Sequence, residues 1–115
     1  MNKQHRLRHP QDFARLREQG RSVRHPYIIL SVLPNDLPYN RYGVITGKRL
    51  GNAVKRNRVR RLIRESVRLL HDRLKPGHDI VIIARHESVG QSYTAIQEAV
   101  YQLFLRVNLV EENKQ

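Results

Sequence analysis

The apolar residues of this chain recur with two different periods, which divide it into predicted strands and helices. Residues 27–33 (YIILSVL) and 79–85 (DIVIIAR) are short runs of β-branched and large apolar side chains without helical spacing, as in strands. The second run lacks polar alternation, which is typical of a strand buried on both faces. Residues 41–47 (RYGVITG) predict the antiparallel partner of the first strand, and residues 21–24 give a weaker strand signal.

Helical spacing appears in three segments. Residues 10–19 begin with a proline, which suits the first position of a helix, and are followed by Gly20, a common helix terminator. Within residues 52–74 apolar side chains recur at i, i+3, i+4 and i+7, the spacing of an amphipathic helix. Ser92 can cap a third helix over residues 93–106, whose apolar face we expect in the core.

The predicted order α-β-β-β-α-β-α indicates an α/β (α+β) two-layer sandwich, in which helices pack against one sheet. At 115 residues the chain is expected to form a single domain, residues 1–115, with one modest core. The polar and basic residues 1–9 predict a flexible arm, and residues 108–115 are expected to form a disordered tail.

The balance of charge indicates a polyanionic partner. The chain has 22 Lys and Arg against 10 acidic residues, a formal net charge of +12, and binding a polyanion relieves such self-repulsion. There is no cysteine, which excludes disulfides, thiolate zinc sites and a cysteine nucleophile. The longest apolar run, residues 80–84, is too short to span a bilayer, and we find no signal-peptide pattern. A cytoplasmic protein is therefore expected.

The positive charge concentrates in residues 48–64, which hold eight Lys and Arg and no acidic residue. On the amphipathic helix, Asn57 and most of the Arg residues fall on the arc opposite the apolar side chains. A solvated helix face is the ordinary explanation of a charge run, but such faces usually mix signs at i, i+4 spacing. Here the cations are mostly Arg, whose planar guanidinium binds phosphate with two hydrogen bonds. The pattern favours a nucleic-acid backbone as the ligand.

The sequence offers no convincing catalytic or metal site. The acidic residues are scattered, and the six histidines are spread over the arm, loops and helix ends without metal-ligand spacing. Residues 47–51 (GKRLG) are not a Walker phosphate loop, although backbone N–H groups beside Lys48 and Arg49 can meet a phosphate. We predict no catalytic residue, no bound metal and no cofactor in the protein itself.

Residues 48–65 (KRLGNAVKRNRVRRLIRE) resemble the Arg-Asn-Arg motif region of the bacterial ribonuclease P protein subunit. The pair at 12–13 (DF), the triplet 42–44 (YGV) and the run 79–85 fit the same family, so the resemblance covers about residues 6–106. It implies that the strand-helix-strand crossover around the basic helix is left-handed, against the usual right-handed rule.

The resemblance also implies a function, the endonucleolytic removal of the 5′ leader from precursor tRNA. In this family a catalytic RNA carries the chemistry and the RNA-containing holoenzyme requires Mg²⁺, so the protein is part of an enzyme without catalytic residues of its own. The implied partners are ribonuclease P RNA and precursor tRNA, with no membrane and no obligate protein partner.

Two RNA surfaces are implied in the same way. The basic helix and the loop before it are expected to dock on ribonuclease P RNA through Lys48, Arg49, Lys55, Arg56, Asn57, Arg58, Arg60, Arg61, Arg64 and Arg68. A cleft between the first helix and the sheet is expected to hold the single-stranded leader through Phe13, Arg17, Tyr27, Ile29 and Ser31.

The second surface departs from the family pattern at two positions. Some family members carry an aromatic side chain where Arg17 stands and another near Ser31, and aromatic rings stack unpaired bases for roughly 1–3 kcal/mol each. The grip on the leader is therefore expected to shift towards phosphate contact and Arg stacking. Phe13 has an equal alternative role as a core residue that packs the first helix.

Two other functions stay open. A ribosomal or other structural RNA-binding protein without an enzyme role has the same size and charge, and co-purification with ribosomal subunits would indicate it. A DNA-binding protein with the basic helix in a major groove is a weaker alternative, because helix-turn-helix spacing and an obvious dimer surface are absent.

Overall fold

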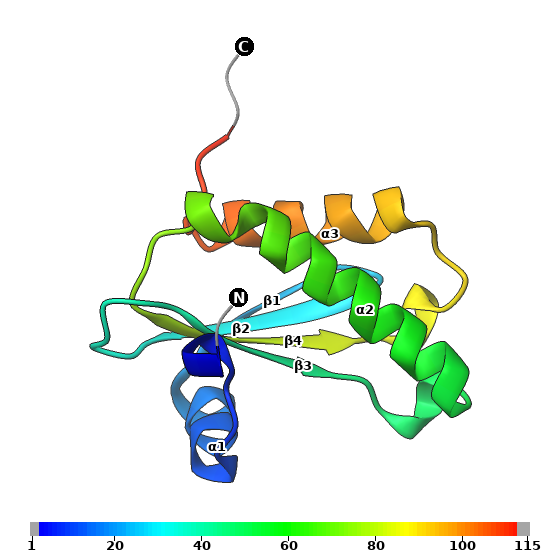
Figure 1. Cartoon of the computed structure of the whole chain (residues 1–115), viewed down its shortest axis with the longest axis horizontal. Helices are drawn as coiled ribbons and strands as arrows, with labels where there is room; N and C mark the ends of the chain where they lie inside the picture. Colours follow the sequence, from blue (N-terminus) through cyan, green and yellow to red (C-terminus); the bar gives the residue numbers. More distant parts are fainter. Residues whose placement is uncertain (1–2, 113–115) are drawn as a thin grey trace.

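The computed structural model describes residues 3–112, which contain three α-helices and four strands, shown in Figure 1. In chain order these elements are α1 (Pro10–Gln19), β1 (Arg21–Arg24), β2 (Ile28–Pro34), β3 (Arg41–Ile45), α2 (Ala53–Leu70), β4 (His78–Ala84) and α3 (Tyr93–Arg106). The second helix is shorter than its apolar pattern predicted, because the chain turns into a short 3-10 helix over His71–Arg73.

The four strands form one sheet in the order β1-β2-β4-β3. β2 is antiparallel to both β1 and β4, whereas β3 is parallel to β4. The prediction that residues 41–47 pair with residues 27–33 is therefore wrong, since β4 lies between the two strands. The physical reason is burial: β4 is the most uniformly apolar strand, with Ile80, Val81 and Ile82 at most 3% exposed, and such a strand belongs in the centre.

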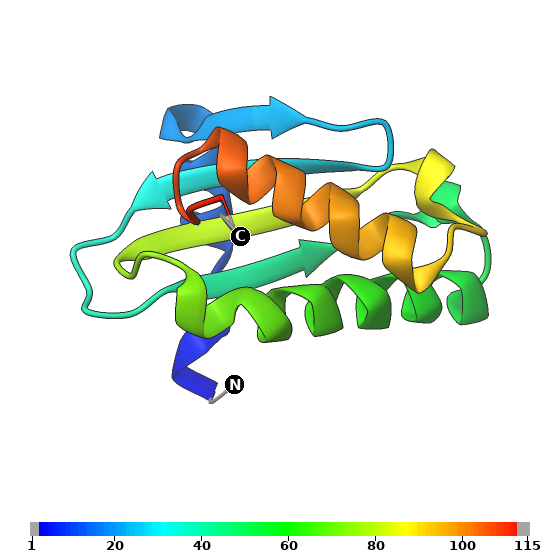
Figure 2. The ribbon, with the colours of Figure 1, turned by 90° about the horizontal axis from the view of Figure 1, so that it is seen from above.

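The connection from β3 through α2 to β4 is left-handed. In Figure 2, α2 lies on the viewer's side of the sheet. When that view is turned so that the parallel strands β3 and β4 point upwards, β4 lies to the left of β3. Nearly all such crossovers are right-handed. The hand expected from the family resemblance is confirmed.

α2 and α3 cover one face of the sheet, and the main core lies between these layers (Figure 1). Five side chains of α3 are fully buried: Ile96, Ala99, Val100, Leu103 and Phe104. α2 contributes Val59, Ile63 and Val67, which its i, i+4 and i+8 spacing places on one side of the helix. These apolar stripes make the two-layer sandwich that the periodicity predicted.

α1 lies on the opposite face of the sheet (Figure 1). Its Leu16 is 2% exposed and forms a second, smaller apolar cluster with Leu7 and Val81, against which Phe13 packs. Because α1 is short, it covers only part of this face, and the rest of the sheet is left without a helix over it.

The N-terminal segment, Lys3 to His9, differs from the expected flexible arm. The Leu7 N–H donates to the Tyr42 carbonyl over 2.8 Å, Arg6 forms an isolated β-bridge with Tyr42, and Leu7 is 4% exposed. An apolar side chain amid basic residues anchors the segment to the edge of β3. The prediction is corrected for this segment, and Met1 and Asn2 lie outside the described residues.

The predicted tail differs in a similar way. Leu109 and Val110 are 3% and 5% exposed and belong to the main core. The Lys75 N–H donates to the Leu109 carbonyl over 2.8 Å. The expected disorder over residues 108–115 is therefore wrong for this first part, while residues 113–115 lie outside the described range.

Candidate nucleic-acid interface

The loop before α2 is anchored by one buried side chain and by the helix cap. A 3-10 turn over Lys48–Leu50 buries Leu50 and leaves Lys48 and Arg49 exposed. The Asn52 side chain caps α2, its carbonyl oxygen accepting the Lys55 N–H over 3.0 Å. The first turn of α2 contains no acidic residue, so the positive end of the helix dipole is not neutralised from within the helix.

α2 separates apolar and cationic residues as its periodicity predicted. Its buried side is formed by Val59, Ile63, Ser66, Val67 and Leu70. The exposed positions include Lys55, Asn57, Arg61, Arg64 and Arg68, whereas Arg56, Arg58 and Arg60 are half-buried. We call the eight polar positions of the second group together the cationic stripe.

Three arginines of the stripe already have partners within the protein. Arg60 donates to the Asn57 side-chain oxygen over 2.9 Å and to the Thr46 hydroxyl. Arg58 donates to the Gln91 carbonyl over 3.0 Å, which ties α2 to the loop before α3.

Arg68 forms the third internal pair, with Glu65 on the same helix. Within residues 3–112, no hydrogen bond or ion pair engages the side chains of Lys55, Arg56, Arg61 and Arg64. These four charges are therefore the most available to an external phosphate.

A groove of about 860 Å³ connects the cationic stripe with the N-terminal segment and α1. Its cationic lining comes from Lys3, Arg6, Arg8, Arg60, Arg61, Arg64 and Arg68. Its apolar lining comes from Leu7, Phe13, Tyr42, Val44, Val67 and Ile82. The lining contains one acidic residue, Glu65, which is paired with Arg68. The groove therefore combines a strongly positive rim with apolar surface.

The cations of the groove crowd one another. The pKa of the Arg64 guanidinium is lowered, first by burial and then by the charges of Arg6 and Arg60. Mutual repulsion of this kind is relieved when an anion binds between the charges. A phosphate of a nucleic-acid backbone supplies that charge and also accepts hydrogen bonds from guanidinium groups.

The part of the N-terminal segment that lies in this groove, namely Lys3, Arg6 and Arg8, was not predicted from the sequence. Their inclusion depends on Leu7, which buries its side chain and so brings both neighbouring arginines to the groove. The available signal was an apolar residue between two basic ones, which a freely solvated arm does not need.

The residues predicted for the leader cleft are only partly brought together. Ile29 and Ser31 alternate along β2 with Ile28 and Leu30, which face the main core, and so lie on the α1 face of the sheet. Ser31 is 8% exposed and shares a hydrogen bond of 2.7 Å with the Ser22 hydroxyl. The register aligns Ile29 with Ile83, so this face offers apolar surface beside α1.

The other three residues of that set differ in position. Phe13 is half-buried and lines the groove, and Arg17 is exposed on α1. Tyr27 packs against the main core and its ring lies 4.9 Å from that of His25. The structure therefore joins Phe13 to the cationic stripe through one groove, whereas Tyr27 is directed towards the opposite layer.

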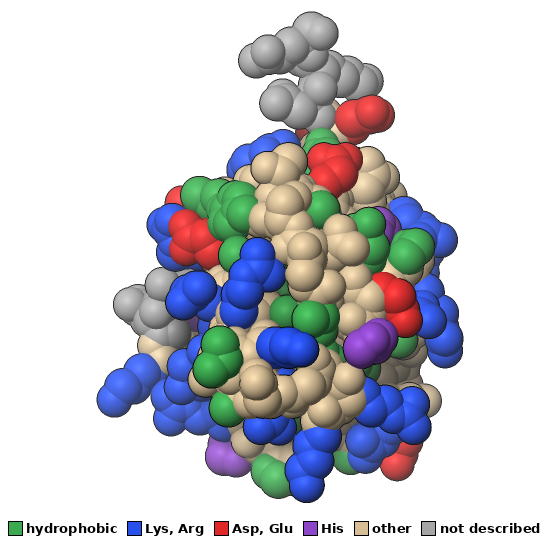
Figure 3. Space-filling model, turned by 90° about the vertical axis from the view of Figure 1, so that its right-hand side faces the viewer, with side chains coloured by type: hydrophobic (Ala, Val, Ile, Leu, Met, Phe, Trp, Pro, Cys, Tyr) green, Lys and Arg blue, Asp and Glu red, His purple; other side chains and the backbone are tan. Residues whose placement is uncertain are grey.

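Among the charged side chains at the end of the molecule where α2 begins, the basic ones prevail (Figure 3). Figure 3 shows that end, and Lys and Arg outnumber Asp and Glu on it. Across residues 3–112, no group of three or more His, Cys, Asp or Glu side chains is arranged to hold a metal ion. No helix in this range is both long and apolar enough to cross a membrane.

Known proteins with similar sequences and structures share one family. The ribonuclease P family model matches residues 1–108. The ribonuclease P protein component of Herpetosiphon aurantiacus is 40% identical over 115 residues, covering 100% of this chain and 94% of that protein. The component of Alkaliphilus metalliredigens is 37% identical over 110 residues, covering 96% and 99% of the two chains.

Solved structures agree with the sequences. The ribonuclease P protein of Staphylococcus aureus superposes with a TM-score of 0.86 at 27% identity, covering 93% of this chain and 98% of that one. The protein from Thermotoga maritima gives a TM-score of 0.81 at 28% identity, covering 88% and 96%. Fold, motif and relatives all agree, and the chain belongs to the ribonuclease P protein family, the protein subunit of the tRNA-processing enzyme ribonuclease P.

Proposed function

We propose that the cationic stripe and its groove dock on ribonuclease P RNA, and that the α1 face of the sheet contacts the 5′ leader of precursor tRNA. In this proposal the RNA subunit, with its Mg²⁺, cleaves the leader, and the protein contributes binding. The observation that supports it most is the groove, in which two cationic segments far apart in sequence face an apolar surface. We place this function in the cytoplasm, because the proposed RNA partners of a bacterial cell are found there. The proposal includes no obligate protein partner.

The protein's contribution would be electrostatic and geometric. By neutralising phosphates, the stripe lowers the Mg²⁺ concentration that the RNA and its substrate need to come together. About six phosphate contacts would make log K fall with log[salt] at a slope near −4 to −5. Contacts that only a leader-bearing RNA can make would favour precursor over mature tRNA, which assists product release.

Cleavage of precursor tRNA at low Mg²⁺ by the cognate ribonuclease P RNA tests the proposal. The reaction is compared without protein, with the wild type and with Arg61→Ala/Arg64→Ala, which removes two charges without internal partners. Arg73→Ala/Lys75→Ala is the matched control, because both side chains are exposed and lie outside the groove. We expect strong stimulation by the wild type and the control, and at least tenfold less by the groove variant.

Absence of stimulation by the wild type over a range of Mg²⁺, despite tight RNA binding, would contradict the proposal. It would favour a structural RNA-binding role. Equal loss in both double variants would show that net charge acts, and not the groove. Circular dichroism of each variant establishes that the helices remain formed.

A further inference from the structure

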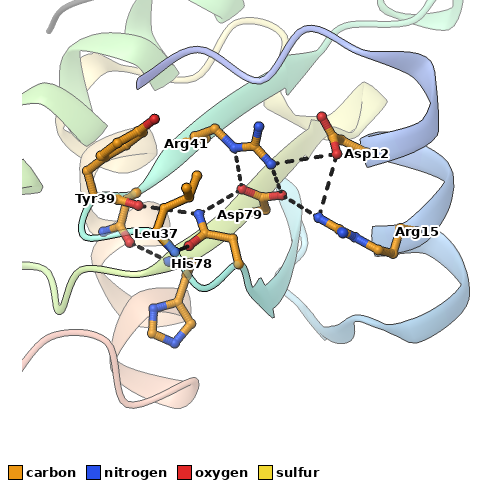
Figure 4. Close-up of polar contacts among 9 residues, drawn as sticks. Asp12, Arg15, Leu37, Tyr39, Arg41, His78 and Asp79 are labelled. Carbon is orange, nitrogen blue, oxygen red and sulfur yellow. Dashed lines mark hydrogen bonds and ion pairs between the residues drawn. The ribbon is translucent and has the colours of Figure 1, made fainter. Parts of the chain in front are cut away.

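A buried carboxylate stands between α1 and the sheet, outside the groove. Asp79 of β4 has no exposed surface. Arg41 of β3 donates two hydrogen bonds to it, from Nε to Oδ1 over 2.8 Å and from Nη2 to Oδ2 over 2.7 Å. Figure 4 shows this two-bond pair, which joins neighbouring strands through their side chains.

Two further segments attach to the same carboxylate. The Asn35 amide donates to Oδ1 over 2.9 Å from the loop after β2, and Arg15 of α1 donates to Oδ2 over 3.2 Å. Asp12 of α1 lies 3.6 Å from both Arg15 and Arg41 (Figure 4). We call these five residues the Asp79 network, and α1 is the one helix that contributes to it.

The hydrogen bonds and ion pairs of the network are not needed merely to pack α1 on the sheet. Replacing a buried ion pair by apolar side chains often leaves stability unchanged or improves it, so such a pair is weak support for a stabilising role. The network instead adds directional contacts: the hydrogen bond from Arg15 to Asp79 and the ion pair between Asp12 and Arg41 hold the helix at a defined angle and distance. The apolar contact of α1 with the sheet, mainly Leu16 and Phe13 on Val81, is small and non-directional.

The position of α1 matters most at Phe13, which lies in sequence between Asp12 and Arg15. Its ring is packed so closely over Gly43 of β3 that a Cβ there would lie 2.8 Å from a ring carbon. A small shift of α1 therefore moves the ring along the floor of the groove. Arg17, one turn further along α1, moves with it.

We propose that the Asp79 network positions α1, with Asp12 and Arg15 acting through the helix to place Phe13 and Arg17 for an unpaired RNA strand. The network thereby determines how strongly leader-bearing RNA is preferred over leaderless RNA. This inference rests on the proposed leader contact and names residues that touch no RNA themselves.

The test uses Arg15→Ala, because this side chain is 43% exposed and its removal leaves the Arg41–Asp79 pair in place. The ratio of affinities of the reconstituted holoenzyme for precursor and mature tRNA is measured. We expect Arg15→Ala to lower this ratio about 3- to 10-fold, part of the effect of losing one stacking side chain. Lys75→Ala, which removes one exposed charge outside the groove and outside the Asp79 network, should leave the ratio unchanged.

Two measurements separate positioning from direct phosphate contact. An arginine that binds a phosphate of a single strand changes the slope of log K against log[salt] by about 0.7 when it is removed. A positioning residue leaves that slope unchanged. The effects of Arg15→Ala and Phe13→Ala should also be less than additive, because both act through the same ring.

Hydrogen exchange of the protein without RNA gives an independent readout. Arg15→Ala should speed the exchange of amides in α1 and leave those of α2 unchanged. Arg15→Lys, which keeps the charge near Asp79, should restore part of both the exchange protection and the tRNA preference.

The possible failures are distinguishable. If the wild type binds precursor and mature tRNA equally, the proposed leader contact fails. If the wild type discriminates and Arg15→Ala discriminates equally, the leader contact stands and the positioning role is overturned. A reduced salt slope with additive effects would also overturn it, by making Arg15 a direct RNA contact.

Discussion

At the residue scale, the structure divides arginines that look equivalent in the sequence into different roles. Arg58 donates to the Gln91 carbonyl, whereas Arg61 is exposed and has no hydrogen-bond or ion-pair partner within residues 3–112. A position in a cationic run therefore does not decide whether a side chain is available to RNA. Arg41, which lies outside that run, is also paired within the protein, with Asp79.

The two stripe arginines should respond differently to truncation. Arg58→Ala should lower the free energy of unfolding by about 1.5–3 kcal/mol, because a partly buried hydrogen bond with a charged donor is lost. Arg61→Ala should leave it within about 0.5 kcal/mol of wild type. Arg61→Ala should bind RNA more weakly, and the slope of log K against log[salt] should become less steep. Urea unfolding and salt-dependent binding measure both effects, and equal stabilities for the two variants would contradict the assignment.

The acid stability of the protein should depend on Asp79. Burial alone would raise its pKa, but hydrogen bonds from Arg41 and Asn35 and the charges of Arg41 and Arg15 hold the pKa below 3.8. Because the folded-state pKa is the lower one, the stabilisation is complete well above pH 3.8 and is lost as the pH falls through the folded-state pKa. Asp79→Asn should destabilise by about 3 kcal/mol at pH 7, since Arg41 loses its partner.

The control for this prediction is Glu98→Gln, an exposed change on α3 that removes one acidic group. Unfolding free energies of wild type and both variants are compared from pH 7 to pH 3. The difference in unfolding free energy between wild type and Asp79→Asn should become smaller as the pH falls towards 3. A gap independent of pH would show that Asp79 does not titrate in the folded protein as its pKa indicates.

At the element scale, the N-terminal segment shows how one apolar residue changes the role of its neighbours. Periodicity identifies helices and strands with several turns or alternations, and a single Leu7 gives no period. Tertiary contacts with Tyr42 and the α1 cluster nevertheless bury it. The lining of the groove depends on this contact.

Leu7→Ala tests that dependence without changing any charge. It should lower the free energy of unfolding by about 2–3 kcal/mol, as for a buried leucine whose cavity partly collapses. RNA affinity should fall as well, because Arg6 and Arg8 lose their fixed place. Leu69→Ala is the matched control, since Leu69 of α2 is 47% exposed. Unchanged RNA affinity in Leu7→Ala would show that the segment contributes nothing to binding.

At the scale of the whole molecule, the dominant quantity is the net charge of +12 on 115 residues. Self-repulsion opposes the compact state, and any anion that binds the folded groove more tightly than the unfolded chain stabilises the fold.

Pyrophosphate should therefore raise the Tm more than chloride at equal ionic strength. The gain in stability is about 2.7 kcal/mol at a concentration 100 times Kd. Differential scanning calorimetry measures the shift. Arg61→Ala/Arg64→Ala should reduce the gain, while Arg73→Ala/Lys75→Ala should keep it. Equal shifts for both anions would indicate screening alone.

Features that depend on local order along the chain were predictable from the sequence. Hydrophobic periods located all three helices and the central strand, and the unneutralised charge run on α2 predicted a nucleic-acid surface there. The motif in residues 48–65 indicated the family, and with it the left-handed crossover, which neither strand nor helix patterns contain. Each of these signals lies within one stretch of chain, because the spacing of apolar residues alone indicates which face of a helix or strand is buried.

How those stretches meet became visible in the folded chain. The place of β4 between β2 and β3, the burial of Leu7, the internal partners of Arg58 and the buried Asp79 all involve residues far apart in sequence. Pairing and burial follow from the competition of all apolar surfaces for one core, and a buried charge is stable only where distant donors converge on it. For that reason the groove and the position of α1 can be seen in the folded structure but cannot be predicted from the motif in residues 48–65.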